Sequence, residues 1–291
     1  MTNQPHSPLF LGIDGGGTKC LVRLENDRGG LLAVAQSGPA NIATSVTVAQ
    51  QSILAATAIA LQKANLPASA IARINAYAGL AGAGLNGAKN TMAQWQHPFA
   101  QFNFSTDLHI ACQGAHDDGN GAIIILGTGF CAGAIKDNSI IELGGHGLLL
   151  SDGASGSWIG LSLFRYALEV LDEMSPSSPL IQCLLTELNC DNSSLLTEQA
   201  LNAKPAYFAS FTPLVFKMQG DPVAHMILTQ AAEFITRYIE HLVKLGYQRI
   251  TLMGGTAKAI TPWLSYTTQS YLCDAQRSPE QGAIQLAKLH L

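Results

Sequence analysis

The stretch LGIDGGGTKCLVRL, residues 11–24, places three consecutive glycines between two aliphatic runs. Each run has the apolar content of a strand, so the stretch is predicted to fold as a β-hairpin with a glycine- and threonine-rich tip. Backbone N–H groups in such a tip can surround phosphate oxygens, because no side chains screen them. The alternative is a plain hairpin turn without a ligand. Three glycines exceed what a plain turn requires, which favours phosphate binding.

Two well-known phosphate-binding motifs do not fit this hairpin. A P-loop places its lysine directly after the last glycine and continues into a helix, whereas here Thr18 precedes Lys19 and a strand-like run follows. The dinucleotide fingerprint has a third glycine where this chain has Cys20, and it also needs a helix. What remains is a tight turn preceded by Asp14. This carboxylate is a candidate to hold Mg²⁺ through water, since that ion keeps several waters and few carboxylates.

The same plan recurs once in the chain. Residues 122–126 and 131–135 read as two strands, and the Gly-Thr-Gly turn 127–129 joins them. Together with the first hairpin, whose strands are predicted at 9–13 and 20–24, this repetition indicates two related α/β halves that face each other.

The remaining pattern alternates helices and strands, which predicts an α/β protein that binds its ligand at the strand ends. The last helix begins with a capping box, in which Ser278 is the cap, Pro279 the first helical residue and Gln281 the third. The other predicted helices are 49–64, 157–171 and 222–245, and the other predicted strands are 74–78, 102–105 and 249–253.

Length and composition point to a compact enzyme of about two domains. The 291 residues are 47% hydrophobic and 12% charged, and the net charge of -4 gives no basic footprint for nucleic acid. No uncharged stretch reads as a membrane span, and residues 1–8 lack the pattern of an export signal. The six scattered cysteines predict reduced thiols in the cytoplasm.

Two polar groupings have more than one reading. His109, Cys112 and His116 fall on one helical face, which suits either part of a zinc site or ordinary packing, and no fourth ligand is evident. Asp117 and Asp118 are followed by Gly119, Asn120 and Gly121, so they read as a solvated turn rather than a catalytic pair.

Six motifs occur in the order seen in a known family. They are GIDGGGT, TDLHIACQGAH, GTG, the stretch GGHG to SDGASGSWIG, MGG and SPEQGAIQLA. Together they resemble the amino-sugar kinases, namely the eukaryotic-type N-acetylglucosamine kinases and the bacterial glucosamine kinases. These belong to the BadF/BadG/BcrA/BcrD ATPase family within the actin-like (sugar kinase/heat-shock protein/actin) superfamily. The resemblance spans nearly the whole chain.

The resemblance implies an α/β fold of two ribonuclease-H-like (actin-like ATPase) domains with a cleft for nucleotide and sugar between them. The N-terminal domain, 1–115, is expected to bind sugar and phosphate and to be completed by the C-terminal helix 279–291. The C-terminal domain, 116–278, is expected to bind the nucleotide and to carry a helical insertion. The expected cofactors are ATP and Mg²⁺. Dimers are common in the family, and the sequence leaves the oligomeric state open.

The resemblance also assigns the ATP site. In the first hairpin, the β- and γ-phosphates would contact Gly15, Gly16, Gly17 and Thr18. In the second hairpin, the phosphates would contact Gly127, Thr128 and Gly129. The adenosine would lie beside Gly254 and Gly255. One residue departs from the family pattern: Phe130 stands where a small polar residue usually follows the GTG turn, so a hydroxyl contact from this position is lost.

Phosphoryl transfer needs in-line positioning, Mg²⁺ and a group that accepts the proton of the sugar hydroxyl. Asp107 is the candidate base, because it follows a predicted strand and matches the Asp of the family's TD motif. The alternative is that Asp107 merely caps the helix that follows.

Sugar recognition needs groups that bind several hydroxyls in fixed geometry. The resemblance assigns this role to Asn41 and Asp152, and it places the backbone of Gly144 and Gly145 near the C2 substituent. His146 either contacts the sugar or packs, and the sequence does not decide between these roles.

The predicted reaction is ATP-dependent phosphorylation of the 6-hydroxyl of N-acetylglucosamine or glucosamine. We expect sugar binding to close the domains and exclude water before transfer. One alternative is an activator ATPase of an iron–sulfur reductase, which needs thiolate ligands. Another is a sugar-sensing DNA-binding regulator, which needs a helix-turn-helix segment ahead of the first strand. The sequence does not distinguish a free amine from an acetamide at C2.

Overall fold

A computed structural model describes residues 7–116, 120–136 and 139–290. The predicted turn at Asp117 and Asp118 lies outside these residues. The chain divides into two compact units. Unit 1 comprises the described residues of Met1–Gly121, Ile135–Ile140 and Ala275–Leu291, and unit 2 comprises Ala122–Ala134 and Ile141–Asp274.

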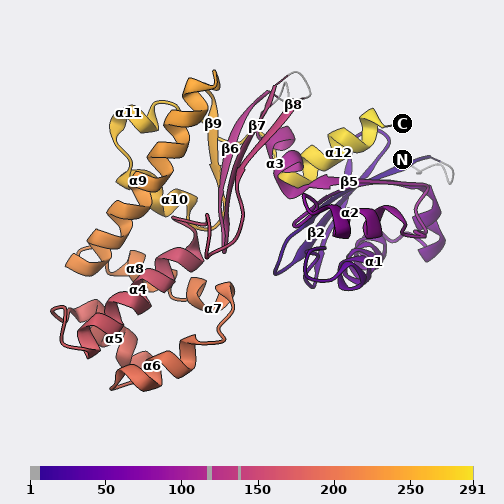
Figure 1. Cartoon of the computed structure of the whole chain (residues 1–291). Helices are drawn as coiled ribbons and strands as arrows, with labels where there is room; N and C mark the ends of the chain where they lie inside the picture. The colour runs from indigo at the N-terminus through magenta and orange to yellow at the C-terminus, as the bar shows by residue number, and fades with distance from the viewer. Residues whose placement is uncertain (1–6, 117–119, 137–138, 291) are drawn as a thin grey trace. The chain divides into compact units, whose positions relative to one another are not determined.

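Unit 1 is built on a five-stranded sheet in the order β3-β2-β1-β4-β5. Two of its strands, β2 and β5, are labelled in Figure 1. The first three strands pair antiparallel, and β4 and β5 extend the sheet in parallel with β1. The carboxyl ends of the parallel strands therefore meet at one edge of the sheet. The strands are β1 (Leu9–Gly15), β2 (Cys20–Asn26), β3 (Leu31–Ser37), β4 (Ile74–Leu80) and β5 (Gln101–Thr106).

Successive side chains of β1 point to opposite faces of this sheet, and both faces are buried. Leu11 and Ile13 enter the core that α1 covers, whereas Phe10 enters a smaller core with α3 and α12 on the opposite face. The helical segments of unit 1 are α1 (Val46–Lys63), η1 (Ala68–Arg73), α2 (Asn86–Ala93), α3 (Asp107–Ala115) and α12 (Pro279–Leu289).

Helices α3 and α12 approach each other through glycines. A Cβ added to Gly282 would lie 2.5 Å from the backbone nitrogen of Gly114, and one added to Gly12 would strike the carbonyl of Glu280. These glycines let α12 pack against both α3 and β1. The capping box of α12 is confirmed, with the Ser278 N–H donating to the Gln281 side chain at 3.0 Å.

The second sheet has the order β8-β7-β6-β9, and unit 2 contains most of it. Helices α4 and α9 belong to this unit (Figure 1). Their apolar faces are buried in its core. The strands are β6 (Gly121–Leu126), β7 (Phe130–Lys136), β8 (Ser139–Gly144) and β9 (Ile250–Met253). The helical segments are α4 (Gly156–Leu171), α5 (Pro179–Glu187), α6 (Ser193–Ala200), α7 (Pro205–Ala209), α8 (Thr212–Lys217), α9 (Pro222–Lys244), α10 (Ala257–Ile260), η2 (Thr261–Trp263) and α11 (Tyr266–Gln269).

The predicted hairpins, the long helices and the other predicted strands are all present, with small differences at their ends. β1 continues through Asp14 and Gly15, two residues beyond the predicted strand 9–13, because Gly15 still pairs with Cys20. Helix α5 begins at Pro179, whose missing N–H costs no hydrogen bond at this position.

All six cysteines are free thiols. Burial raises the pKa of both Cys20 and Cys112 to about 12, so these two stay protonated at neutral pH. None of the helices in the described ranges has the length and hydropathy of a membrane-spanning helix.

Candidate active site

The tip of the first hairpin exposes backbone N–H groups. The Gly16 N–H donates to the Lys19 carbonyl at 2.9 Å, and the Gly16 carbonyl accepts from Ala40 at 2.9 Å. Among the residues that the structure describes, none accepts a hydrogen bond from the N–H groups of Gly17 or Thr18. Both residues are exposed. Adjacent unbonded N–H groups on a fixed turn form an anion-binding concavity.

Glycine stands at positions 15 and 17 of this hairpin for different physical reasons. A Cβ on Gly15 would lie 2.6 Å from a methyl group of Leu80, so the packing of unit 1 requires glycine there. A Cβ on Gly17 would meet no atom within 4 Å, and its φ is not in the left-handed region. The fold therefore does not demand glycine at position 17, which leaves close approach of a ligand as a physical reason for it.

Asp14 is the next-to-last residue of β1, just before this tip. Burial, followed by the charges of Asp107 and Glu280, raises its pKa to about 6, while the charge of Lys19 acts in the opposite direction. The four side chains are therefore near one another electrostatically, and Asp14 is more basic than an ordinary carboxylate. A single carboxylate of this kind can hold a hydrated Mg²⁺ ion through water, since that ion keeps several waters and few carboxylates.

Asp107 is the first residue of α3, directly after β5. The helix is capped by Thr106, whose hydroxyl accepts from the His109 N–H at 3.3 Å. Asp107 accepts from the Leu108 N–H through Oδ1 at 3.0 Å. The N-cap is thus Thr106, and Asp107 adds a second side-chain hydrogen bond at the start of the helix. Parallel pairing of β1, β4 and β5 brings Asp107 to the same sheet edge as Asp14.

Sequence reasoning missed Glu280 and the effect of Lys19. Glu280 is only 8% exposed, at the second position of α12, and its charge reaches Asp14. Glu280 belongs to the capping motif SPEQ. That motif predicts where a helix begins, but it does not indicate which residues the start of the helix will contact.

Asn41 lies in a tight turn of unit 1. Its Oδ1 accepts from the Ala43 N–H at 2.9 Å and, more weakly, from Thr44 at 3.4 Å. The Nδ2 group donates to no residue in the described part of the chain. The turn thus fixes the side chain through one atom and leaves its donor free for a sugar oxygen.

The first residues of α4 donate hydrogen bonds to the tip of the second hairpin. The Gly127 N–H donates to the Gly129 carbonyl at 3.0 Å, and the Gly127 carbonyl accepts from Gly156 at 2.8 Å. Ser157 donates to the Thr128 carbonyl through both its N–H, at 3.1 Å, and its hydroxyl, at 2.7 Å. Within the described residues, the N–H groups of Thr128 and Gly129 have no acceptor, so this tip also presents donors suited to phosphate.

Asp152 connects this second tip to the GGHG loop. Its carboxylate accepts from the Gly147 N–H at 3.1 Å and from the Phe130 N–H, and a Cβ on Gly129 would lie 2.9 Å from its Oδ2. Burial raises the pKa of Asp152, although these hydrogen bonds oppose the shift. The Ser151 hydroxyl, which sequence reasoning did not select, also contacts Asp152 at 3.4 Å.

The GGHG loop adopts left-handed backbone conformations, which favour glycine. Gly144 and Gly145 have φ of 69° and 73°, and Gly145 is exposed. Phe130 does not face solvent, because its ring is 2% exposed and packs beneath Gly144. His146 is exposed, and its N–H donates to the Ser151 hydroxyl at 2.7 Å.

The MGG motif follows β9. Gly254 has φ of 99° and abuts the Leu126 carbonyl, to which the Thr256 N–H also donates at 3.2 Å. A Cβ on Gly255 would meet no atom within 4 Å. Gly254 is thus required by the fold, and Gly255 is left open for a ligand.

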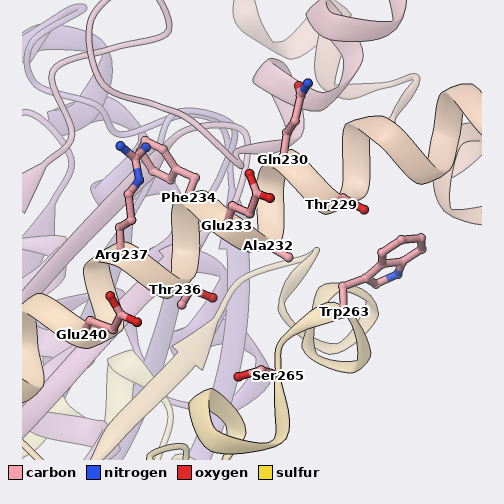
Figure 2. A pocket seen from close by; sticks show the side chains of 10 residues that line it. All are labelled: Thr229, Gln230, Ala232, Glu233, Phe234, Thr236, Arg237, Glu240, Trp263 and Ser265. Carbon is pink, nitrogen blue, oxygen red and sulfur yellow. The ribbon is translucent and has the colours of Figure 1, made fainter.

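An open groove of about 630 Å³ runs along α9 (Figure 2). Its lining includes Phe234, Arg237 and Trp263, and none of the predicted site residues belongs to it. Arg237 stacks over the Phe234 ring with its guanidinium carbon 5.2 Å from the ring centre (Figure 2).

The His109, Cys112 and His116 face is packed. His109 makes an edge contact with Tyr77 at 6.4 Å, the Cys112 thiol donates to the Gly121 carbonyl at 3.3 Å, and His116 is fully buried. In the described part of the chain, no three His, Cys, Asp or Glu side chains are grouped so as to hold a metal ion directly.

Two sheets with glycine-rich hairpin tips and flanking helices define an actin-like ATPase fold. The chain superposes on a crystal structure from Chromobacterium violaceum that carries a provisional N-acetylglucosamine kinase assignment, with a TM-score of 0.91, 30% identity, and coverage of 97% of this chain and 100% of that one. A ROK family glucokinase from Streptomyces griseus, solved with glucose and AMPPNP, shares the fold at a TM-score of 0.57 and 16% identity, with coverage of 97% and 98%.

The chain belongs to the BadF/BadG/BcrA/BcrD ATPase family, whose sequence profile matches residues 11–287. It is 35% identical over 280 residues to the glucosamine kinase GspK of Vibrio cholerae serotype O1, and the aligned region covers 96% of this chain and 95% of the relative. It is also 32% identical over 130 residues to the N-acetyl-D-glucosamine kinase of Dictyostelium discoideum, over 43% and 41% of the two chains.

Proposed function

We propose that this protein is a hexosamine kinase, which transfers the γ-phosphoryl group of ATP to the 6-hydroxyl of glucosamine or N-acetylglucosamine. The observation that carries the proposal is the electrostatic proximity of Asp14 and Asp107 at one sheet edge of unit 1. This arrangement pairs a carboxylate suited to Mg²⁺ with a carboxylate suited to accept a proton. The similarity of this chain to a glucosamine kinase, over 96% of its length, supports an amino sugar as the substrate.

The residues present fit ATP and Mg²⁺. Each hairpin tip offers two N–H groups without acceptors among the described residues, and Gly17 and Gly255 leave space where a Cβ would stand. We assign the phosphates to the two tips, the adenosine to Gly254 and Gly255, and water-mediated Mg²⁺ binding to Asp14. When bound, the cation neutralises charge on the phosphates.

Asp107 accepts the proton of the sugar hydroxyl in this scheme. The oxygen of the 6-hydroxyl forms a bond to the γ-phosphorus, and the bond from that phosphorus to the oxygen bridging to the β-phosphate breaks. The hydroxyl proton passes to Asp107, and ADP leaves with the bridging oxygen. Asn41 in unit 1 and Asp152, Gly144 and Gly145 in unit 2 are proposed to hold the sugar.

The alternative of an iron–sulfur activator requires thiolate ligands. The six cysteines are scattered along the chain, which disfavours this alternative, and burial holds two of them, Cys20 and Cys112, as thiols. The free thiols are compatible with a reducing compartment, and we propose the cytoplasm.

The test is a coupled assay of ADP release over a panel of hexoses, with the phosphorylated carbon located by NMR. Wild type should turn over at least one amino sugar faster than glucose and yield the 6-phosphate. Turnover of neither glucosamine nor N-acetylglucosamine would refute the substrate class.

A further inference from the structure

Three aromatic rings lie together beside the GGHG loop of unit 2, and we refer to Phe130, Phe234 and Tyr238 as the aromatic cluster. Phe130 comes from β7, and the other two come from α9. The ring centres of Phe130 and Tyr238 are 4.6 Å apart, and each ring is 5.0 Å from that of Phe234. Phe130 packs edge-on against the other two rings, whose planes are tilted by 36° to each other, and close packing of this kind fixes ring positions. The Tyr238 hydroxyl is therefore held in place by its neighbours.

The hydroxyl of Tyr238 is directed at Gly144. A Cβ built on Gly144 would lie 3.1 Å from Tyr238 Oη and 3.1 Å from Cε1 of Phe130. The aromatic cluster thus occupies the side-chain position of this glycine and brings a polar atom to the loop.

This hydroxyl makes no hydrogen bond to any residue that the structure describes. Tyr238 is only partly buried, so the hydroxyl remains available to solvent or ligand. Burial raises the pKa of Tyr238, the charge of Arg237 lowers it and the charge of Asp152 raises it, with a net upward shift that keeps the hydroxyl protonated. Both charged groups are therefore within electrostatic range of Tyr238.

Two polar groups therefore lie at this side of the loop: the Tyr238 hydroxyl, which can accept or donate a hydrogen bond, and the Asp152 carboxylate, which only accepts. An ammonium group offers three donors and a positive charge, so it can bond to both groups. An acetamide offers one N–H and an acceptor oxygen, and the latter is repelled by the carboxylate.

Resting on the proposed function, we infer that Tyr238 binds the C2 nitrogen of the sugar and selects the free amine of glucosamine over an acetamide. Its hydroxyl accepts a hydrogen bond from the ammonium group beside the backbone of Gly144. The carboxylate of Asp152 adds the attraction of its charge. Nothing in the reaction itself requires this hydroxyl, so its role is in substrate choice.

The test compares wild type with Tyr238→Phe on glucosamine and on N-acetylglucosamine at neutral pH. The variant keeps the ring of the aromatic cluster and removes only the hydroxyl. We expect kcat/KM for glucosamine to fall about tenfold or more, as for a lost hydrogen bond to a charged group, and kcat/KM for N-acetylglucosamine to change by less than about threefold. Tyr271→Phe, which removes a hydroxyl from another ring packed against the core of unit 2, is the matched control and should leave both values unchanged.

A change in sugar preference is the decisive readout, because a merely structural role would lower activity on both sugars equally. An equal loss on both sugars, or no loss on either, would overturn the inference while leaving the hexosamine kinase proposal intact. So would a wild-type enzyme that phosphorylates N-acetylglucosamine but not glucosamine. Failure of wild type on both sugars would instead remove the proposed function itself.

Discussion

Asp14 and Asp107 interact electrostatically within unit 1: burial first, and then the charge of Asp107, raise the pKa of Asp14 to about 6. β1 and β5 do not touch, and β4 lies between them with both pairings parallel. The sheet therefore delivers the two carboxylates to one edge, which is where α/β proteins bind their ligands.

The first prediction concerns the pH dependence of turnover. Asp14 must be ionised to hold Mg²⁺, and its pKa of about 6 lies close to neutral pH. We expect kcat/KM for ATP, measured with saturating Mg²⁺ and sugar, to decline as the pH falls through about 6. A profile that stays flat well below this pH would contradict the assignment of Asp14.

The second prediction uses the two neighbours that act on Asp14 in opposite directions. Glu280→Gln removes a negative charge that raises the pKa of Asp14, so the acid limb should move to lower pH. Lys19→Met removes a positive charge that lowers it, so the limb should move to higher pH. Opposite shifts measured in the same assay support the cluster, and shifts of the same sign speak against it.

The third prediction concerns stability. A carboxyl whose pKa rises from 3.8 to about 6 on folding destabilises the native state above pH 6, where it is charged in both states. Asp14→Asn should therefore raise the free energy of unfolding by at most about 3 kcal/mol at pH 8, and the residual solvent contact of the side chain keeps the gain below that limit.

The gain should shrink to about half at pH 5, because the folded carboxyl is then mostly protonated and uncharged. Urea unfolding of both proteins at the two pH values measures this difference. The same variant should lose most of its turnover, so stability and activity should move in opposite directions. A variant that is less stable than wild type at pH 8 would show that burial does not penalise this charge.

The fourth prediction separates ligand glycines from packing glycines. Gly17→Ala adds a methyl group to open space, so unfolding should be unchanged, but KM for ATP should rise about tenfold through lost phosphate contacts. Gly87→Ala is the matched control, since its Cβ also meets no atom, and it should leave KM unaltered. Gly12→Ala should instead destabilise the fold by about 1–3 kcal/mol, because its Cβ strikes the Glu280 carbonyl.

Much of the fold could be predicted from local patterns. The two hairpins combine apolar runs with glycine turns, and α9 keeps a helical period over its whole length, so both are visible in the sequence. Strand β3 starts with an apolar run at residues 31–35, directly after two glycines, but it lacks the glycine- and threonine-rich turn that marks the two hairpins. Helices α5–α8 are short and start at prolines or polar caps, which resemble the punctuation of a loop.

The candidate site could be predicted only in part. Asp107 and Asp152 stand in motifs, so a resemblance selects them. Glu280 and Tyr238 are brought to the site by helix packing, and a residue on a helix face carries no sign of what it will meet. The capping role of Thr106 likewise depends on where α3 begins, which residue patterns place only to within one or two positions.

The measurement that tests the central claim most directly is the turnover number of Asp107→Asn with an amino sugar as substrate. The amide keeps the shape of the side chain and can no longer accept the proton. We predict that kcat falls at least about 100-fold, while the melting temperature and the affinity for ATP stay close to wild type. A variant that retains the wild-type kcat would contradict the assignment of Asp107 as the base.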